Sequence, residues 1–180
     1  VSFEINWIVY LIFAMFVIVG CVNAVNLTDG IDGLASSVTF VVMLAYVIAA
    51  GVLNYFHLAV YAAAVAGGCA GFSLWNFHPA KVFMGDTGSM YLGGAVTALA
   101  FCMSRPELLL FFGFIYICEA GSVVIQVSYF KATHGKRIFK MTPIHHSFEM
   151  DGWSEEKIVA SFSLVAVAAA ALGLVFIRLS

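Results

Sequence analysis

The chain has 180 residues, of which 63% are hydrophobic and only 10% are charged, and its formal net charge is −2. A soluble domain of this size cannot bury that much apolar surface, so the composition indicates an integral membrane protein. The charge balance gives no sign of a nucleic-acid partner. Alternating segments of about ten residues, typical of a membrane barrel, are not visible. We therefore expect an all-α fold, a polytopic membrane helix bundle embedded in the lipid bilayer.

Uncharged apolar segments predict about six transmembrane helices. Residues 34–80 contain no Asp, Glu, Lys or Arg, and this stretch is long enough for two spans with a break near residues 51–57. The predicted spans are 5–25, two within 34–80, then 88–104, 107–130 and 158–177. No internal repeat or low-complexity linker interrupts the pattern. We expect residues 1–180 to form a single transmembrane domain.

Three polar connections are expected on one side of the membrane. Two spans separate residues 26–33 from residues 76–89, and two more separate these from residues 131–157. Because an even number of crossings returns the chain to the same side, the three connections face one compartment. All Lys and Arg residues except Arg105 and Arg178 lie on that side. The positive-inside rule therefore predicts that this side is cytoplasmic.

The first polar connection contains two closely spaced carboxylates. Asp29 and Asp32 are three residues apart, so one helical turn would place both on the same face. Gly30 and Gly33 allow the backbone to approach a ligand closely. Because a carboxylate at the centre of a membrane span costs roughly 2.5–3.5 kcal/mol, we expect this pair at the wet end of a span, facing an anionic substrate through a metal ion. The alternative is a polar loop in which Asp29 caps a helix.

The second connection carries a third aspartate just before a predicted helix. Asp86 lies between glycines at a helix start, where backbone N–H groups and the helix dipole favour anions. A carboxylate at such a place makes most sense with a cation, and Mg²⁺ bridging to phosphate is the natural candidate. The alternative is that Asp86 caps the helix from Gly88 onward. Phe83 could stack on a base, whereas His78 and Pro79 are expected to form a turn.

The third connection is basic and then rich in histidine. Lys136, Arg137 and Lys140 would suit a pyrophosphate or, equally, the anionic inner leaflet, and charge alone favours the lipid. The adjacent His145 and His146 are expected to point in different directions rather than to chelate one metal ion. Hydrogen bonds to phosphate or sugar oxygens are easier for them to make.

One acidic residue lies inside a predicted span. Such residues usually face the bundle interior and mark function, but a structural hydrogen bond between helices explains Glu119 equally well. Gln126 lies two helical turns further on, so both side chains line one face. The cysteines are isolated within apolar segments and are expected to be small buried hydrophobic residues.

Three motifs on the expected cytoplasmic face together resemble those of the phospho-N-acetylmuramoyl-pentapeptide transferases. They are Asn-Leu-Thr-Asp-Gly-Ile-Asp-Gly-Leu at 26–34, Phe-Met-Gly-Asp-Thr-Gly-Ser at 83–89, and Pro-Ile-His-His-Ser-Phe-Glu at 143–149 followed by Gly-Trp-Ser-Glu at 152–155. The resemblance covers essentially the whole chain, including Gly-Lys-Arg-Ile-Phe-Lys at 135–140. Each motif alone is modest, but the three at this spacing are very specific.

The resemblance implies an enzyme of peptidoglycan synthesis in the bacterial inner (plasma) membrane, with its active site facing the cytoplasm. Such an enzyme transfers phospho-MurNAc-pentapeptide from UDP-MurNAc-pentapeptide to undecaprenyl phosphate. The products are lipid I and UMP, and the reaction requires Mg²⁺. The resemblance also leaves open a homodimer.

The resemblance further implies roles for particular residues. Asp86 is the expected metal ligand, Asp29 and Asp32 hold the nucleotide-sugar end, and Phe83 stacks on uracil. His145 and His146 match the first two positions of a family histidine triplet, whereas Ser147 replaces the third. The expected catalytic residues are Asp29, Asp32, Asp86, His145 and His146. The expected substrate-binding residues are Asn26, Gly30, Ile31, Asn76, Phe83, Gln126, Lys136 and Arg137.

Two other functions are weighed against this one. A sister transferase using UDP-GlcNAc would share the aspartate motifs but differ around the histidines. A transporter or scaffold without enzymatic activity would place polar groups at the membrane midplane, where only Glu119 qualifies.

The chain also departs from the family pattern. It contains no Asp-Asp pair, although the family carries such a motif in its first half and has about ten spans. We therefore expect this chain to be the C-terminal portion of a larger transferase that lacks part of the catalytic centre.

Overall fold

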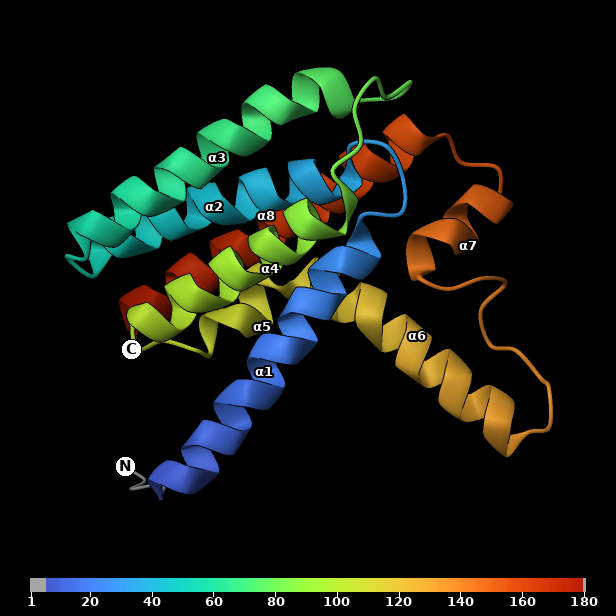
Figure 1. Cartoon of the computed structure of the whole chain (residues 1–180), viewed down its shortest axis with the longest axis horizontal. Coiled ribbons are helices and arrows are strands. Elements are labelled where there is room, and N and C mark those ends of the chain that lie inside the picture. Colours follow the sequence, from blue (N-terminus) through green and yellow to red (C-terminus); the bar gives the residue numbers. More distant parts are fainter. Residues whose placement is uncertain (1–5, 180) are drawn as a thin grey trace.

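The computed structural model describes residues 6–179, and this part of the chain is helical without strands (Figure 1). The helices are α1 (Trp7–Thr28), α2 (Leu34–Val52), α3 (Phe56–Asn76), α4 (Gly85–Cys102), α5 (Leu108–Phe112), α6 (Phe114–Ala132), α7 (Ile144–Met150) and α8 (Glu155–Leu179). The predicted all-α fold is confirmed. Each expected span corresponds to a helix of 18 to 25 residues, namely α1, α2, α3, α4, α6 and α8. The first expected span begins at Ile5, which lies outside the described residues.

Fewer helices have a strongly apolar composition than the six expected. Within the described residues, α1, α2, α3 and α8 are long and apolar enough to cross a membrane. The other two long helices carry more polar residues, because α4 has Asp86 in its first turn and α6 contains Glu119, Gln126 and Lys131. The predicted span 107–130 is also divided into α5 and α6 at Gly113.

Small residues allow the helices to pack closely. α2 lies against α3 and α8, while α1 crosses α4 and α6 (Figure 1). A Cβ atom at Gly93 of α4 would lie 2.7 Å from the Cα atom of Val22, so the backbones of α1 and α4 meet where no larger residue fits. The buried Tyr46 ring packs edge-on against Phe112 at a centroid distance of 4.8 Å. The contact between Tyr46 and Phe112 joins α5 to α2.

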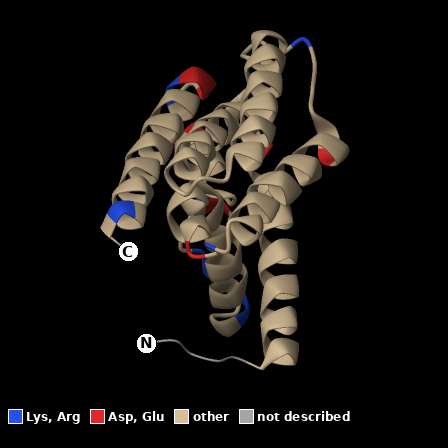
Figure 2. Cartoon of the chain, turned by 90° about the vertical axis from the view of Figure 1, so that its left-hand side faces the viewer, with Lys and Arg blue, Asp and Glu red and all other residues tan. Residues whose placement is uncertain are grey.

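Charged residues gather at the helix ends and the connections. Figure 2 shows helices without charge along most of their length, with Lys, Arg, Asp and Glu near their termini. Large apolar side chains are exposed on the outer faces, among them Phe16 at 78% and Leu74 at 79%. This pattern is typical of helices that face lipid.

The three polar connections lie at one end of the bundle, on the right in Figure 1. Residues 29–33 join α1 to α2, residues 77–84 join α3 to α4, and residues 133–154 include α7 and lead to α8. The even number of crossings predicted this arrangement, and the structure confirms it. Direct hydrogen bonds between the connections hold this end together.

Candidate active site

The acidic connection is a turn rather than a helical segment. α1 ends at Thr28, residues 29–33 form successive turns, and Gly33 has a φ of +81° that a residue with a side chain would adopt only with strain. Asp29 and Asp32 therefore do not share one helical face, and that expectation was wrong. The glycine stops α1 from continuing into α2, and its N–H donates to Asn76 Oδ1 at 3.1 Å.

A cavity of about 260 Å³ lies between the acidic turn and the start of α4. Its walls include half of the eight residues expected to bind substrate, together with Asp29, Asp32 and Asp86. The lining residues are Asp29, Gly30, Ile31, Asp32, Asn76, Phe83, Met84, Gly85 and Asp86. The Phe83 side chain is 75% exposed at this cavity, so its ring is accessible to a ligand.

The carboxyl groups at the cavity form a set of hard oxygen donors. Burial and, to a smaller extent, the negative charge of Asp86 together raise the pKa of Asp29 to about 6. None of the described residues lining this cavity is Lys or Arg. A hard divalent cation such as Mg²⁺ prefers carboxylate oxygens and would relieve the repulsion between them. The residues present therefore fit the expected metal ion.

Asp86 is held by the end of α1. Asn26 Nδ2 donates to Asp86 Oδ1 at 3.0 Å and lies 2.9 Å from Ser89 Oγ. Asp86 lies in the first turn of α4, which begins at Gly85, and the residue at the N-cap position is Met84. The capping alternative for Asp86 therefore does not hold in this structure.

Asn76 joins the two connections from within the bundle. Its side chain is nearly buried, its Oδ1 accepts from the N–H of Gly33, and its Nδ2 donates to the carbonyl of Val82 at 3.0 Å. Ser36 Oγ donates to the same Oδ1 at 3.3 Å. Because these bonds occupy Oδ1 twice and one N–H of Nδ2, Asn76 shapes the cavity wall.

The two histidines meet at the acidic turn. His145 is buried with its Nδ1 3.0 Å from Glu119 Oε2, and His146 Nδ1 pairs with Glu149 on the same helix. The two ring centroids are 4.1 Å apart. A Cβ atom built on Gly30 would lie 2.3 Å from His145 Nε2 and 3.3 Å from His146 Nε2. Both Nε2 atoms therefore lie near Gly30, and the expectation that the two rings point in different directions was wrong.

Three predicted binding residues lie elsewhere. Gln126 Oε1 accepts from the N–H groups of Ile138 and Phe139, at 3.1 and 3.0 Å. It lines a second cavity with Arg137, and Lys136 is exposed in the same segment. Gln126 belongs to α6, which diverges from the bundle in Figure 1. The structure thus does not bring Gln126 to the cavity of Asn76 and Phe83.

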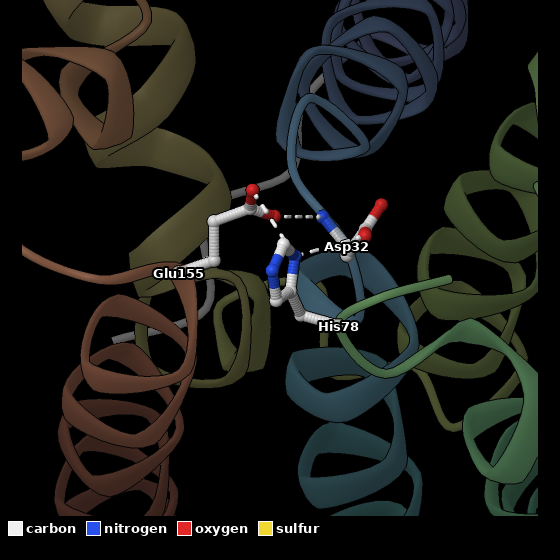
Figure 3. Close-up of side chains that lie close together, drawn as sticks. All are labelled: Asp32, His78 and Glu155. Carbon is white, nitrogen blue, oxygen red and sulfur yellow. Dashed lines mark hydrogen bonds and ion pairs between the residues drawn. The ribbon is translucent and has the colours of Figure 1, made fainter.

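A second polar cluster, Asp32–His78–Glu155, fastens the site to α8. Figure 3 shows the His78 ring between the carboxylates of Asp32 and Glu155. Its Nδ1 lies 3.2 Å from Asp32 Oδ2 and 3.3 Å from Glu155 Oε1. Asp32 Oδ2 also accepts from the N–H of Ala80, and Glu155 Oε2 accepts from the N–H of Asp32. The sequence assigned His78 to a turn and gave Glu155 no role of its own, although crossing parity had placed all three connections together.

Fold and site together define a polytopic helical membrane protein with a carboxylate and histidine site at one end of its bundle. Residues 1–104 match the glycosyl transferase family 4, and the chain belongs to this family. The predicted resemblance to the phospho-N-acetylmuramoyl-pentapeptide transferases is confirmed by curated relatives that carry this name.

The relatives match most of this chain but less than half of their own length. The phospho-N-acetylmuramoyl-pentapeptide transferase of Acetivibrio thermocellus is 49% identical over 147 residues, which is 81% of this chain and 44% of the relative. That of Alkaliphilus oremlandii is 51% identical over 141 residues, covering 78% and 42%. That of Halalkalibacterium halodurans is 49% identical over 130 residues, covering 72% and 40%. The chain thus spans about two fifths of the length of these relatives.

Proposed function

We propose that the protein containing this chain transfers phospho-MurNAc-pentapeptide from UDP-MurNAc-pentapeptide to undecaprenyl phosphate, forming lipid I and releasing UMP. One observation carries the proposal: Asp29 of the acidic turn and Asp86 of the first turn of α4 border the same cavity. The Nε2 atoms of His145 and His146 lie against Gly30 of its wall. Relatives named for this activity support the assignment.

A phosphoryl transfer that exchanges one pyrophosphate bond for another depends more on positioning and charge neutralisation than on covalent catalysis. In phosphoryl transfer the protein mainly aligns the attacking and leaving oxygens and balances negative charge. Asp86, with Asp29 beside it, would hold Mg²⁺, which neutralises pyrophosphate charge and orients the phosphate when bound. Asn26 fixes the Asp86 carboxylate, and the exposed Phe83 ring offers a stacking surface for uracil. One pyrophosphate bond is exchanged for another, so the reaction needs no energy-coupling module.

The position of the site suits substrates of opposite solubility. A nucleotide sugar arrives from water, whereas a polyprenyl phosphate is confined to the bilayer. The cavity lies at the ends of apolar helices, where both can meet. The excess of Lys and Arg on this side supports a cytoplasmic orientation in the bacterial inner membrane.

The test is a transfer assay on the protein as the cell produces it, purified in detergent. Labelled UDP-MurNAc-pentapeptide, undecaprenyl phosphate and Mg²⁺ should give a labelled lipid and UMP in equal amounts. Unlabelled UDP-GlcNAc in tenfold excess should leave the rate unchanged. Transfer of GlcNAc phosphate to the lipid would instead identify the sister transferase and contradict the proposal.

A further inference from the structure

Glu119 and His145 form a buried pair at the inner edge of the candidate active site. Both side chains are 0% exposed, and Glu119 Oε2 lies 3.0 Å from His145 Nδ1. We assign the proton of this bond to Nδ1 of the imidazole, because a carboxylate oxygen is a common acceptor for a histidine Nδ1–H. This assignment leaves Nε2 as the ring nitrogen with a free lone pair.

The free nitrogen is directed at the acidic turn. A Cβ atom on Gly30 would lie 2.3 Å from His145 Nε2 and 2.8 Å from Cε1, so the ring edge meets the backbone next to Asp29. Neither Nε2 of His145 nor Oε1 of Glu119 has a hydrogen-bond partner among the described residues, although both atoms are buried. Buried polar atoms without partners are rare in folded proteins, and each calls for an explanation. Two in one pair beside the cavity point to a substrate group.

We propose that Glu119 is a positioning residue that holds the proton on His145 Nδ1, so that Nε2 accepts the acidic proton of the acceptor phosphate. This inference rests on the proposed function. In the step, the phosphate O–H bond breaks, the new N–H bond forms at Nε2, and the electron pair stays on the phosphate oxygen. The product is a dianionic phosphate, which is the better nucleophile toward the donor pyrophosphate. Nδ1–H remains bonded to Glu119 throughout, as in other carboxylate–histidine pairs.

The His146–Glu149 pair is built differently. His146 and Glu149 are three residues apart on α7, and their side chains are 26% and 32% exposed. A contact within one short helix and open to solvent fixes an imidazole less firmly than a buried contact between α6 and α7. We therefore assign the role of fixing a histidine tautomer to Glu119 and not to Glu149.

Kinetics of a charge-removing variant give the first test. Glu119→Gln, in the protein as the cell produces it, should lower kcat about 10- to 100-fold, as is typical for groups that orient a catalytic histidine, while KM for both substrates stays nearly constant. Glu107→Gln on the N-terminal side of α5, near Arg105, is the matched control and should keep wild-type kcat. Wild-type kcat in Glu119→Gln would contradict the proposal.

A spectroscopic test does not depend on turnover, and its wild-type measurement does not depend on a variant that folds. With ¹⁵N-labelled histidine, His145 in the wild-type protein should show a protonated Nδ1 and an unprotonated Nε2; Glu119→Leu should show a mixture of both tautomers. A proton on Nε2 in the neutral wild-type imidazole would overturn the inference. A wild-type protein that forms no lipid product would contradict the proposed function, and the nitrogen shifts would still decide whether Glu119 fixes the tautomer.

Discussion

At the scale of single residues, the proposal that Asp86 is a metal ligand rests on its surroundings. Asp86 is exposed at the first turn of α4, where the positive end of the helix dipole meets the cavity. Asn26 from α1 orients its carboxylate, and the pKa of Asp29 is raised chiefly by burial and further by the negative charge of Asp86. These two carboxylates repel one another unless a cation lies between them.

Replacing the Asp86 charge should remove activity without unfolding the protein. Asp86→Asn keeps the side-chain volume and a hydrogen-bonding partner for Asn26. It should weaken the binding of Mg²⁺, because a hard cation with few protein ligands loses one charged ligand. We expect turnover at limiting Mg²⁺ to fall at least about 100-fold, equivalent to about 2.7 kcal/mol in the barrier. A Mg²⁺ titration of the transfer rate measures this.

The matched control is Asp151→Asn in the connection between α7 and α8, where the aspartate pairs with Lys140 near the surface. It should keep wild-type turnover. Near-normal activity of Asp86→Asn at limiting Mg²⁺ would show that the metal ion is bound elsewhere.

Residue identities could be predicted from the sequence better than side-chain directions. The sequence placed His145 and His146 correctly in one polar connection but predicted that their rings diverge. In the structure each Nδ1 is held by a glutamate, Glu119 or Glu149, and this brings both Nε2 atoms toward Gly30. The Glu119 contact joins α6 to α7, and no local spacing reveals a partner on another helix.

At the scale of elements, the Asp32–His78–Glu155 cluster connects the acidic turn to the N-terminus of α8. One imidazole N–H is shared between two carboxylates, and the Glu155 carboxylate also accepts from the N–H of Asp32. Because the His78 side chain is 42% exposed, these contacts add modestly to global stability. Their main effect should be local: they should keep the acidic turn ordered.

Removing the imidazole should loosen the acidic turn. His78→Leu leaves the carboxylates of Asp32 and Glu155 to repel one another, and we expect the turn's free energy of opening to fall by about 1 kcal/mol. Amide hydrogen exchange at residues 29–34 should then be about fivefold faster. His57→Leu, at the opposite end of α3, is the matched control. Unchanged exchange at these amides in His78→Leu would show that the cluster does not hold the turn.

The helices themselves could be predicted well from hydrophobic patterning, and their breaks less well. Every expected span corresponds to a long helix, but 107–130 is divided at Gly113, where a Cβ atom would lie 2.5 Å from the carbonyl oxygen of Leu109. This division lets α6 diverge, and Gln126 then contacts the backbone of residues 138–139. Apolar composition is continuous across the break, so hydropathy alone could not locate it.

At the scale of the whole molecule, the site depends on topology. Asn26 and Asp86, and likewise Gly33 and Asn76, are far apart in the sequence, yet paired crossings return them to one end of the bundle. Counting spans therefore predicted the convergence of the three connections before any contact was known. The sequence could not predict which of the converging residues line the 260 Å³ cavity, because that depends on side-chain packing between helices.

The central claim is that residues from three connections act as one catalytic unit, and the coupling between variants tests it most directly. Turnover would be measured for Asp86→Asn, for His145→Gln and for the double variant. Residues that act in one step show strongly non-additive losses. We predict that the double variant retains a turnover within about threefold of the slower single variant. A double variant whose loss equals the product of the two single losses would contradict the account, because the two side chains would then act independently.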